Sequence, residues 1–447
     1  MILRRSIKFL LYFTIISLSI TAAAQNHGHD HDHENHSHTE SQSSDAHNHH
    51  DHDHDDHSGH DHDTHGHDSS ACGGHHDFDI TATAMHHISD ANVYTILDWI
   101  RIPLPCIVYS KDAGWDFFMS SVFAPGHHDD GHYAYNGYVL HMGTIKRILD
   151  ASFPSTGSVV VDGFSIKTIE VEGKEKQESY VCYGGNRFLL EEKTVWDLGL
   201  LGGSITSFYD FSITKNVTSM ILLFLLLFFL LRAAAKGYAK RKGSAPKGVQ
   251  SFLEPVVIYI RDEVAVPFIG EKRYEQFLPL LLSIFFFILG LNLWGQVPFL
   301  GGTNVSGSLT VTMVLALLVF IISNIKGNKH YWQHIFWMPG VPLLVKPLLA
   351  LIEIMSLFIK PLTLMLRLAG NITAGHIAIL SFIGLIFIFG ESGKNITGGI
   401  VGAVLSTLLT LFMMAIELIV AFIQAYVFTL LSASYIGAAV EEHQEHH

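Results

Sequence analysis

The chain has 447 residues, a formal net charge of −13, 49% hydrophobic residues and a mean hydropathy of +0.30. This hydrophobic content is concentrated in long runs after Asn216. It excludes a wholly soluble globular protein and indicates an exported first half followed by a membrane-embedded second half. We therefore expect the lipid bilayer to be one partner, and we expect no nucleic acid among the others.

Residues 1–24 have the pattern of a secretory signal peptide. A basic start precedes a short apolar core at 9–20, and small residues at 22–24 stand just before Gln25. The alternative is a first transmembrane anchor, but the apolar core is shorter than a helix needs to cross a bilayer. We therefore predict that this segment is removed.

Residues 25–77 contain more than half of the 30 histidines, many aspartates and almost no apolar side chains. Such a segment cannot bury a core, so we expect it to be disordered. Imidazoles interleaved with carboxylates suit weak binding of Zn, Ni or Cu, and the first candidates are His27, His29, His31 and His33. The spacing does not build one closed site, so a solvating spacer without a ligand is the alternative.

Residues 78–210 are predicted to form a small exported α+β domain. A short helix is expected at 85–90, capped by Ser89 or Asp90. Extended segments, the first interrupted by prolines, are predicted at 99–109, 159–161, 166–171 and 180–183, with a turn at 172–174. A second His/Asp cluster at 127–132 is more typical of a solvated loop than of a metal site. No catalytic constellation is predicted in this region.

The three cysteines are Cys72, Cys106 and Cys182, and all of them precede the membrane part. Export would place them where disulfides persist. A bridge between Cys106 and Cys182 is one arrangement, and the sequence leaves the pairing open.

The membrane half, residues 211–447, begins with a predicted span that ends at 231. The basic segment at 232–273 is expected in the cytoplasm by the positive-inside rule, which places the preceding residues outside, as the signal peptide also does. Within this segment, residues 251–266 have apolar positions at near-helical spacing. They predict an amphipathic helix on the membrane surface, although a short soluble helix fits equally well.

Four further apolar runs follow, at 277–297, 309–322, 347–389 and 399–440. The last two are much longer than a perpendicular crossing requires, so we expect strongly tilted or broken helices. A polar turn at 391–395 joins them on the outer side, and the C-terminus is expected in the cytoplasm. The predicted fold is a membrane all-α protein with about five membrane helices, including a long tilted C-terminal hairpin, plus the exported α+β region.

The hairpin contains an arginine, Arg367, that has no acidic residue within a helical turn. An arginine in hydrocarbon costs roughly 3–15 kcal/mol and cannot lose its proton to avoid that cost. Glu353 and Lys360 lie 14 and 7 positions before it, and Thr363 and Asn371 lie four positions to either side. At about 100° per residue, these side chains share one side of the helix with Arg367.

His376, nine residues after Arg367, is expected on the opposite side of that helix. On the last helix Thr410, Glu417 and Gln424 are spaced by seven. Polar groups of this kind can simply hold helices together. An unpaired arginine with two carboxylates, a lysine and a histidine in one hairpin is instead typical of an ion pathway. A fixed cation between two polar tracks blocks direct proton transfer, so a mobile carboxylate on a second protein is needed.

Three short motifs carry a family resemblance: Leu-Arg-Leu-Ala-Gly-Asn at 366–371, Ala-Gly at 374–375 and Ile-Gln-Ala-Tyr-Val-Phe at 423–428. They resemble the signatures of subunit a of the F-type ATP synthase. The resemblance extends from about Phe208 to His443. The N-terminal region exceeds a minimal subunit a and is similar to the extended subunits of some bacteria.

The resemblance implies specific roles. Arg367 would be the essential arginine that faces the c-ring carboxylate, and Gln424 would be the glutamine opposite it. Glu353, Asn371, His376 and Glu417 would line two offset proton half-channels. Some relatives have a carboxylate where this chain has His376 and a histidine where it has Glu417. This exchange predicts that the two side chains are close in space.

The implied partners are the c-subunit ring, the b subunits of the peripheral stalk, the remaining ATP synthase subunits and the lipid bilayer. The chain would need no cofactor. It would not be an enzyme by itself but the translocating subunit of a proton-transporting two-sector ATPase. The implied location is a bacterial inner membrane, with the N-terminal region periplasmic and the C-terminus cytoplasmic.

The main rival is a divalent-metal transporter, which the His-rich segment suggests. Against it, the hairpin has a single histidine and an unpaired arginine that would repel a cation. A scaffold that only anchors the exported domain is the third hypothesis.

Overall fold

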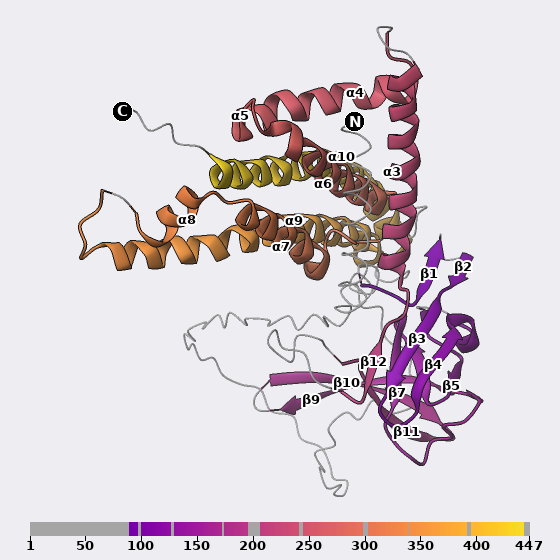
Figure 1. Cartoon of the computed structure of the whole chain (residues 1–447). Coiled ribbons are helices and arrows are strands. Elements are labelled where there is room, and N and C mark those ends of the chain that lie inside the picture. The colour runs from indigo at the N-terminus through magenta and orange to yellow at the C-terminus, as the bar shows by residue number, and fades with distance from the viewer. Residues whose placement is uncertain are drawn as a thin grey trace, which may run out of the picture.

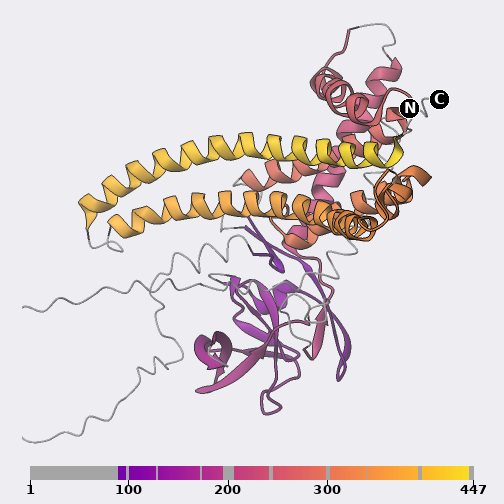
Figure 2. The ribbon, with the colours of Figure 1, turned by 90° about the vertical axis from the view of Figure 1, so that its left-hand side faces the viewer.

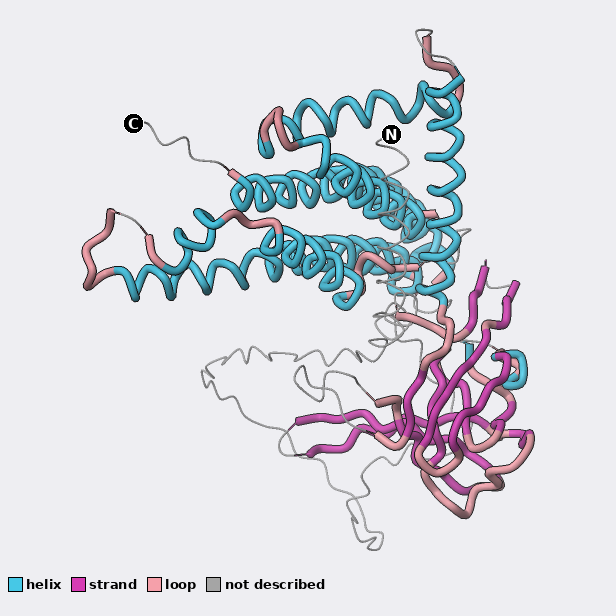
Figure 3. The backbone as a smooth tube through the Cα atoms, viewed as in Figure 1, coloured by secondary structure: helices cyan, strands magenta, loops and turns pink. Residues whose placement is uncertain are grey.

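The computed structural model describes residues 89–96, 100–126, 129–171, 174–194, 206–240, 245–297, 303–338, 340–390 and 395–441. The predicted signal peptide and the His/Asp-rich segment, with its candidate metal ligands, lie outside these residues. The described chain has two parts, a β-rich region followed by a bundle of helices (Figures 1 and 3).

The β-rich region contains a hairpin and two larger antiparallel sheets. The hairpin pairs β1 (Val93–Ile96) with β2 (Ile100–Pro103). A three-stranded sheet has the order β12-β3-β4, with β12 (Phe208–Asp210), β3 (Pro105–Ser110) and β4 (Gly114–Met119). The two prolines inside the predicted 99–109 segment stand at the junction of β2 and β3. Proline has no N–H to donate to a β-ladder, so a strand end is a suitable place for it.

The second sheet has seven strands in the order β8-β5-β6-β7-β11-β10-β9. These strands are β5 (Tyr133–Tyr135), β6 (Tyr138–His141), β7 (Thr144–Ile148), β8 (Ser158–Val160), β9 (Gly163–Val171), β10 (Lys174–Tyr183) and β11 (Asn186–Glu191). Strands are confirmed at all three predicted positions. β8 matches 159–161 within one residue, whereas β9 begins three residues before 166 and β10 begins six residues before 180. Two apolar clusters form the core of the region, one around Tyr138 and one around Phe153.

The expectation of an α+β domain is wrong for the described residues, which are β-rich. A 3-10 turn, Ser120–Phe123, is a helical element of this region, and no α-helix occurs among its described residues. The helix predicted at 85–90 lies mostly outside the description, and Asp90 is not helical. Its carboxylate instead accepts hydrogen bonds from the Thr214 hydroxyl at 2.7 Å and the Asn216 backbone N–H at 3.0 Å. Asp90 therefore satisfies donors at the start of the first long helix.

Cys106 is a buried free thiol, so the bridge between Cys106 and Cys182 is not formed. In the cluster at 127–132, residues 127–128 lie outside the description. Asp129 lies 3.4 Å from Arg101, and the Asp130 carboxylate lies 2.9 Å from His141 Nδ1. These two aspartates hold the loop within the fold.

The helical part begins with α3 (Lys215–Lys240). Next come α4 (Val249–Tyr259), a π-helical turn (Ile260–Ala265) and α5 (Val266–Ile269), which follow one another without a break and include the helix predicted at 251–266. The later helices are α6 (Tyr274–Gln296), α7 (Leu309–Ile325), α8 (Lys329–Phe336), α9 (Lys346–Phe389) and α10 (Ile396–Val440).

Four of the described helices are long and apolar enough to cross a membrane: α3, α6, α9 and α10. Helices α7 and α8 form a fifth candidate if they are one span bent by 104°. The predicted number of about five spans agrees with this finding. Helix α6 lies in the centre, with 78% of its apolar window buried, whereas the same measure is 11% for α9 and for α10.

Helices α9 and α10 run side by side along their lengths and lie across the direction of α3 (Figure 2). The expected long C-terminal hairpin is confirmed. Its two helices pack on α6 and α7 through part of their surface. The remaining surface is open, which leaves apolar side chains such as Phe358 and Ile419 exposed.

Candidate functional site

Arg367 lies on the open side of α9. Its side chain is exposed, and so are those of Thr363 and Asn371 one turn away in either direction. Within the described residues Arg367 makes no hydrogen bond or ion pair. A Cβ added to Gly370 would meet no atom within 4 Å, so this chain leaves the space beside the arginine unoccupied. The predicted grouping of Thr363, Arg367 and Asn371 on one side is confirmed.

His376 lies on the inward side of the same helix, as the spacing predicts. Its Nε2 atom is 3.7 Å from Oε1 of Glu417 on α10. The side chains are 16% and 4% exposed, respectively, so the pair is largely enclosed. The predicted proximity of these two residues is therefore confirmed.

Gly375 allows the Glu417 carboxylate to approach α9. A Cβ at position 375 would lie 3.0 Å from Glu417 Oε1. The same oxygen is buried without a hydrogen-bond partner among the described residues. A separation of 3.7 Å from His376 Nε2 is too long for a direct hydrogen bond. One bridging water, or a small rotation of either side chain, would connect the two groups.

A series of buried polar atoms leads away from this pair. A Cβ at Gly295, near the end of α6, would lie 3.6 Å from His376 Nε2 and 2.6 Å from the Thr303 carbonyl oxygen. The pair is therefore next to the end of α6 and the segment before α7. Side-chain atoms buried here without a described hydrogen-bond partner belong to Asn292, Trp294, Gln296, Thr303 and, on α10, Thr410. Buried polar atoms of this kind are sites for ordered water.

The segment before α7 also contacts α9 directly. Asn304 Nδ2 lies 3.5 Å from Thr373 Oγ1, and the Thr373 hydroxyl donates to the Gly307 carbonyl at 3.3 Å. Sequence reasoning did not select Thr303, Asn304 or Thr373. The available signal was a short polar stretch between two apolar runs, which is also what an ordinary surface loop looks like.

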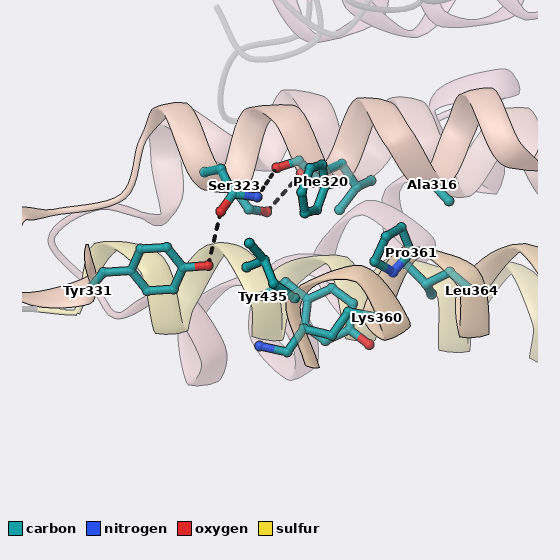
Figure 4. Close-up of a pocket in the computed structure, with 11 residues that line it drawn as sticks. Ala316, Phe320, Ser323, Tyr331, Lys360, Pro361, Leu364 and Tyr435 are labelled. Atoms are coloured by element: carbon teal, nitrogen blue, oxygen red, sulfur yellow. Dashed lines mark hydrogen bonds between the residues drawn. The ribbon is translucent and has the colours of Figure 1, made fainter. Parts of the chain in front are cut away.

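A second polar region lies farther toward the N-terminal end of α9, where a small pocket is lined by α7, α8, α9 and α10 (Figure 4). Tyr331 of α8 donates a 3.2 Å hydrogen bond to Asn324 of α7. Lys360 of α9 places Nζ 5.6 Å from the centre of the Tyr435 ring, within the range of a cation–π contact.

The remaining predicted residues are less closely connected. Glu353 is half-buried on α9, seven residues before Lys360. Gln424 is buried on α10 and is 7% exposed. Within the described residues, no group of three or more His, Cys, Asp or Glu side chains could hold a metal ion.

Comparisons with known proteins agree with the family motifs. Residues 217–437 match the family model described as ATP synthase A chain, and residues 83–163 match a domain of unknown function (DUF8433). ATP synthase subunit a of Anaeromyxobacter dehalogenans is 36% identical over 277 residues, which cover 60% of this chain and 68% of that protein.

Two further relatives cover similar shares of the chain. ATP synthase subunit a of Chloroherpeton thalassium is 38% identical over 53% of this chain and 69% of its own length. That of Myxococcus xanthus is 36% identical over 56% of this chain and 79% of its own length. Together with the long apolar hairpin, these matches show that the chain belongs to the family of subunit a of the F-type ATP synthase.

Proposed function

We propose that this chain is the stator proton channel of its ATP synthase, with Arg367 separating two offset half-channels. Family membership supports a role in ion transport and ATP synthesis and implies partnership with the c-ring and the other synthase subunits. The observation that carries the finer proposal is the exposure, on the open side of α9, of an arginine that has no ion pair or hydrogen bond among the described residues. A partner that brings a carboxylate to this face would neutralise the arginine.

The arginine would act through its charge. A guanidinium close to a carboxylate favours the ionised form of that carboxylate and so promotes release of its proton. In the low dielectric of a membrane interior this attraction is much stronger than in water. A c-ring carboxylate would therefore give up its proton as it approaches Arg367 and take up another after passing it. Gln424 and Asn371 are the further residues that the resemblance assigns to this region.

One half-channel would reach the c-ring through His376 and Glu417. From their 3.7 Å separation, a small rotation of either side chain would bring the two groups within hydrogen-bonding distance for a proton relay. The buried polar atoms of Asn292, Gln296 and Thr303 would hold the waters that connect the pair to the β-rich side. The other half-channel would use Glu353 and the polar pocket around Lys360 and Tyr331.

The proposal also assigns the two ends of the chain to sides of the membrane. The N-terminal region would be periplasmic after removal of a signal peptide, and the C-terminus would be cytoplasmic, in a bacterial inner membrane. The b subunits of the peripheral stalk would complete the stator. The family needs no cofactor. Weak Zn, Ni or Cu binding by His27, His29, His31 and His33 stays a prediction, and the comparisons do not support a divalent-metal transporter.

The test is ATP-driven proton pumping and ATP synthesis in membrane vesicles that contain the whole synthase with Arg367→Ala. We expect both activities to be lost while the complex stays assembled. Arg261→Ala is the matched control, because Arg261 is a half-exposed arginine outside the hairpin that pairs with Asp262. Normal coupling in the Arg367→Ala synthase would refute the proposal.

A further inference from the structure

The β1–β2 hairpin lies beside the first turns of α3. The Lys215 backbone N–H donates to the Ala91 carbonyl at 2.7 Å, so the base of the hairpin is level with the first residue of α3. One helical turn further on, Ser219 Oγ lies 3.4 Å from the Tyr94 hydroxyl. The hairpin therefore extends in the same direction as α3. Figure 1 shows both strands to the right of α3, whereas α9 and α10 lie to its left.

The polarity of β2 is opposite to that of a strand on a water-soluble protein. Arg101 is turned inward, with Nε 3.4 Å from Asp129 Oδ1. Its neighbours Ile100 and Ile102 point outward and are 56% and 44% exposed. A sheet with one face in water has apolar residues inside and polar residues outside. Strands that face lipid have the reverse alternation.

The position of the hairpin beside the start of the apolar stretch of α3 explains this reversal. Lys215 is the last charged residue before the apolar stretch of α3. Ser219 is four residues further, about 6 Å along the helix axis. Ile102 pairs with Tyr94, whose hydroxyl reaches Ser219, and Ile100 pairs with Ile96. The second pair lies two residues nearer the hairpin tip, about 7 Å farther along the strands.

These levels correspond to the boundary between headgroups and acyl chains, where surface-bound elements bury an apolar side about 5–10 Å deep. Some water is present at this depth, so the unpaired backbone groups of a two-stranded hairpin can be satisfied, which the hydrocarbon centre would not allow. A lipid surface is thus compatible with both the exposed isoleucines and the hairpin backbone.

We propose that the β1–β2 hairpin is a membrane-surface anchor, which inserts Ile100 and Ile102 into the lipid leaflet on the side of the β-rich region. The anchor and α3 together would hold that region against the bilayer. The inference is independent of the proton pathway, because none of its residues lies on α9 or α10.

The test places single cysteines in the assembled synthase, labels them with bimane and reconstitutes the complex into phosphatidylcholine vesicles. The variants are Ile100→Cys and Ile102→Cys. Val160→Cys on β8 is the matched control, because Val160 is 59% exposed and β8 is the edge strand of the seven-stranded sheet. Of the native cysteines, Cys106 is buried and Cys182 is disulfide-bonded, so neither should take the label, and the unsubstituted synthase taken through the same labelling gives the background. Fluorescence is measured with lipids that carry a nitroxide near the top of the acyl chain, and separately with aqueous iodide.

We expect the labels at 100 and 102 to lose most of their fluorescence to nitroxide lipids and little to iodide, with the opposite result at 160. Strong quenching by iodide at 100 and 102 would mean that the hairpin stands in water. Protection from both quenchers would mean that another protein covers it. Either of these two results would overturn the proposal.

Discussion

The two sides of α9 carry different kinds of polar group. Arg367 stands on an open side, without an ion pair or hydrogen bond among the described residues. His376, two and a half turns away, is enclosed beside Glu417. A relay group works best when its neighbours hold it in place, whereas a group that meets a moving partner must be left uncovered. Under the proposed function, proton conduction within this chain and exchange with its partner would take place on opposite sides of one helix.

The largest loss of proton flux is expected from removing a relay group on the inward side of α9. Glu417→Ala should slow proton flux through the membrane sector about 100-fold, the scale on which a positioned acid–base group contributes. The double exchange His376→Glu with Glu417→His should retain more flux than either single exchange, because it keeps one acid and one imidazole together. Proton flux in vesicles measures this. A double exchange no better than the worse single would contradict the paired relay.

A smaller loss is expected from Gly375→Ala. The new methyl group would lie 3.0 Å from Glu417 Oε1 and would push the carboxylate away from its present position. A misplacement of about 1 Å can reduce a rate about 100-fold, and the carboxylate needs to move by only a few tenths of an ångström, so we expect roughly a tenfold loss of flux. Gly399→Ala on α10 is the control, because its methyl group would meet no atom closer than 3.6 Å. Equal flux in the two variants would mean that the Glu417 position is not critical.

The smallest effect is expected from Thr303→Val. This change distinguishes a hydroxyl that holds water for the pathway from one that stabilises the fold. Thr303→Val removes a buried hydroxyl that has no described partner, so it should leave the thermal stability of the complex unchanged or slightly higher. If this hydroxyl holds water for the pathway, proton flux should fall a few-fold. Flux and melting temperature are measured on the same preparation. An unchanged flux would remove Thr303 from the proposed route.

The membrane part of this fold was largely predictable from the sequence. Helical periodicity is a local property, so the positions of Arg367 and His376 on opposite sides of α9 follow from their spacing alone. The closeness of His376 and Glu417 came from the exchange of residue types relative to the family, since periodicity within one helix says nothing about a second helix.

Other features depend on contacts between distant parts of the chain. Asp90 was expected to cap its own helix but instead satisfies donors near residue 216, which local propensity cannot reveal. The end of α6 at Gly295 and the Thr303 backbone lie next to His376 only because segments far apart in the sequence pack together. The bend between α7 and α8 likewise requires knowledge of what these helices pack against.

The most direct test of the account is passive proton flux through the membrane sector of the Arg367→Ala synthase, driven by an imposed pH gradient without ATP. If Arg367 separates two half-channels, its removal should abolish ATP synthesis while protons still pass, because the c-ring carboxylate could then exchange with both sides. Loss of passive flux together with synthesis would instead mean that the arginine is needed to form the pathway, and would contradict its role as a separator.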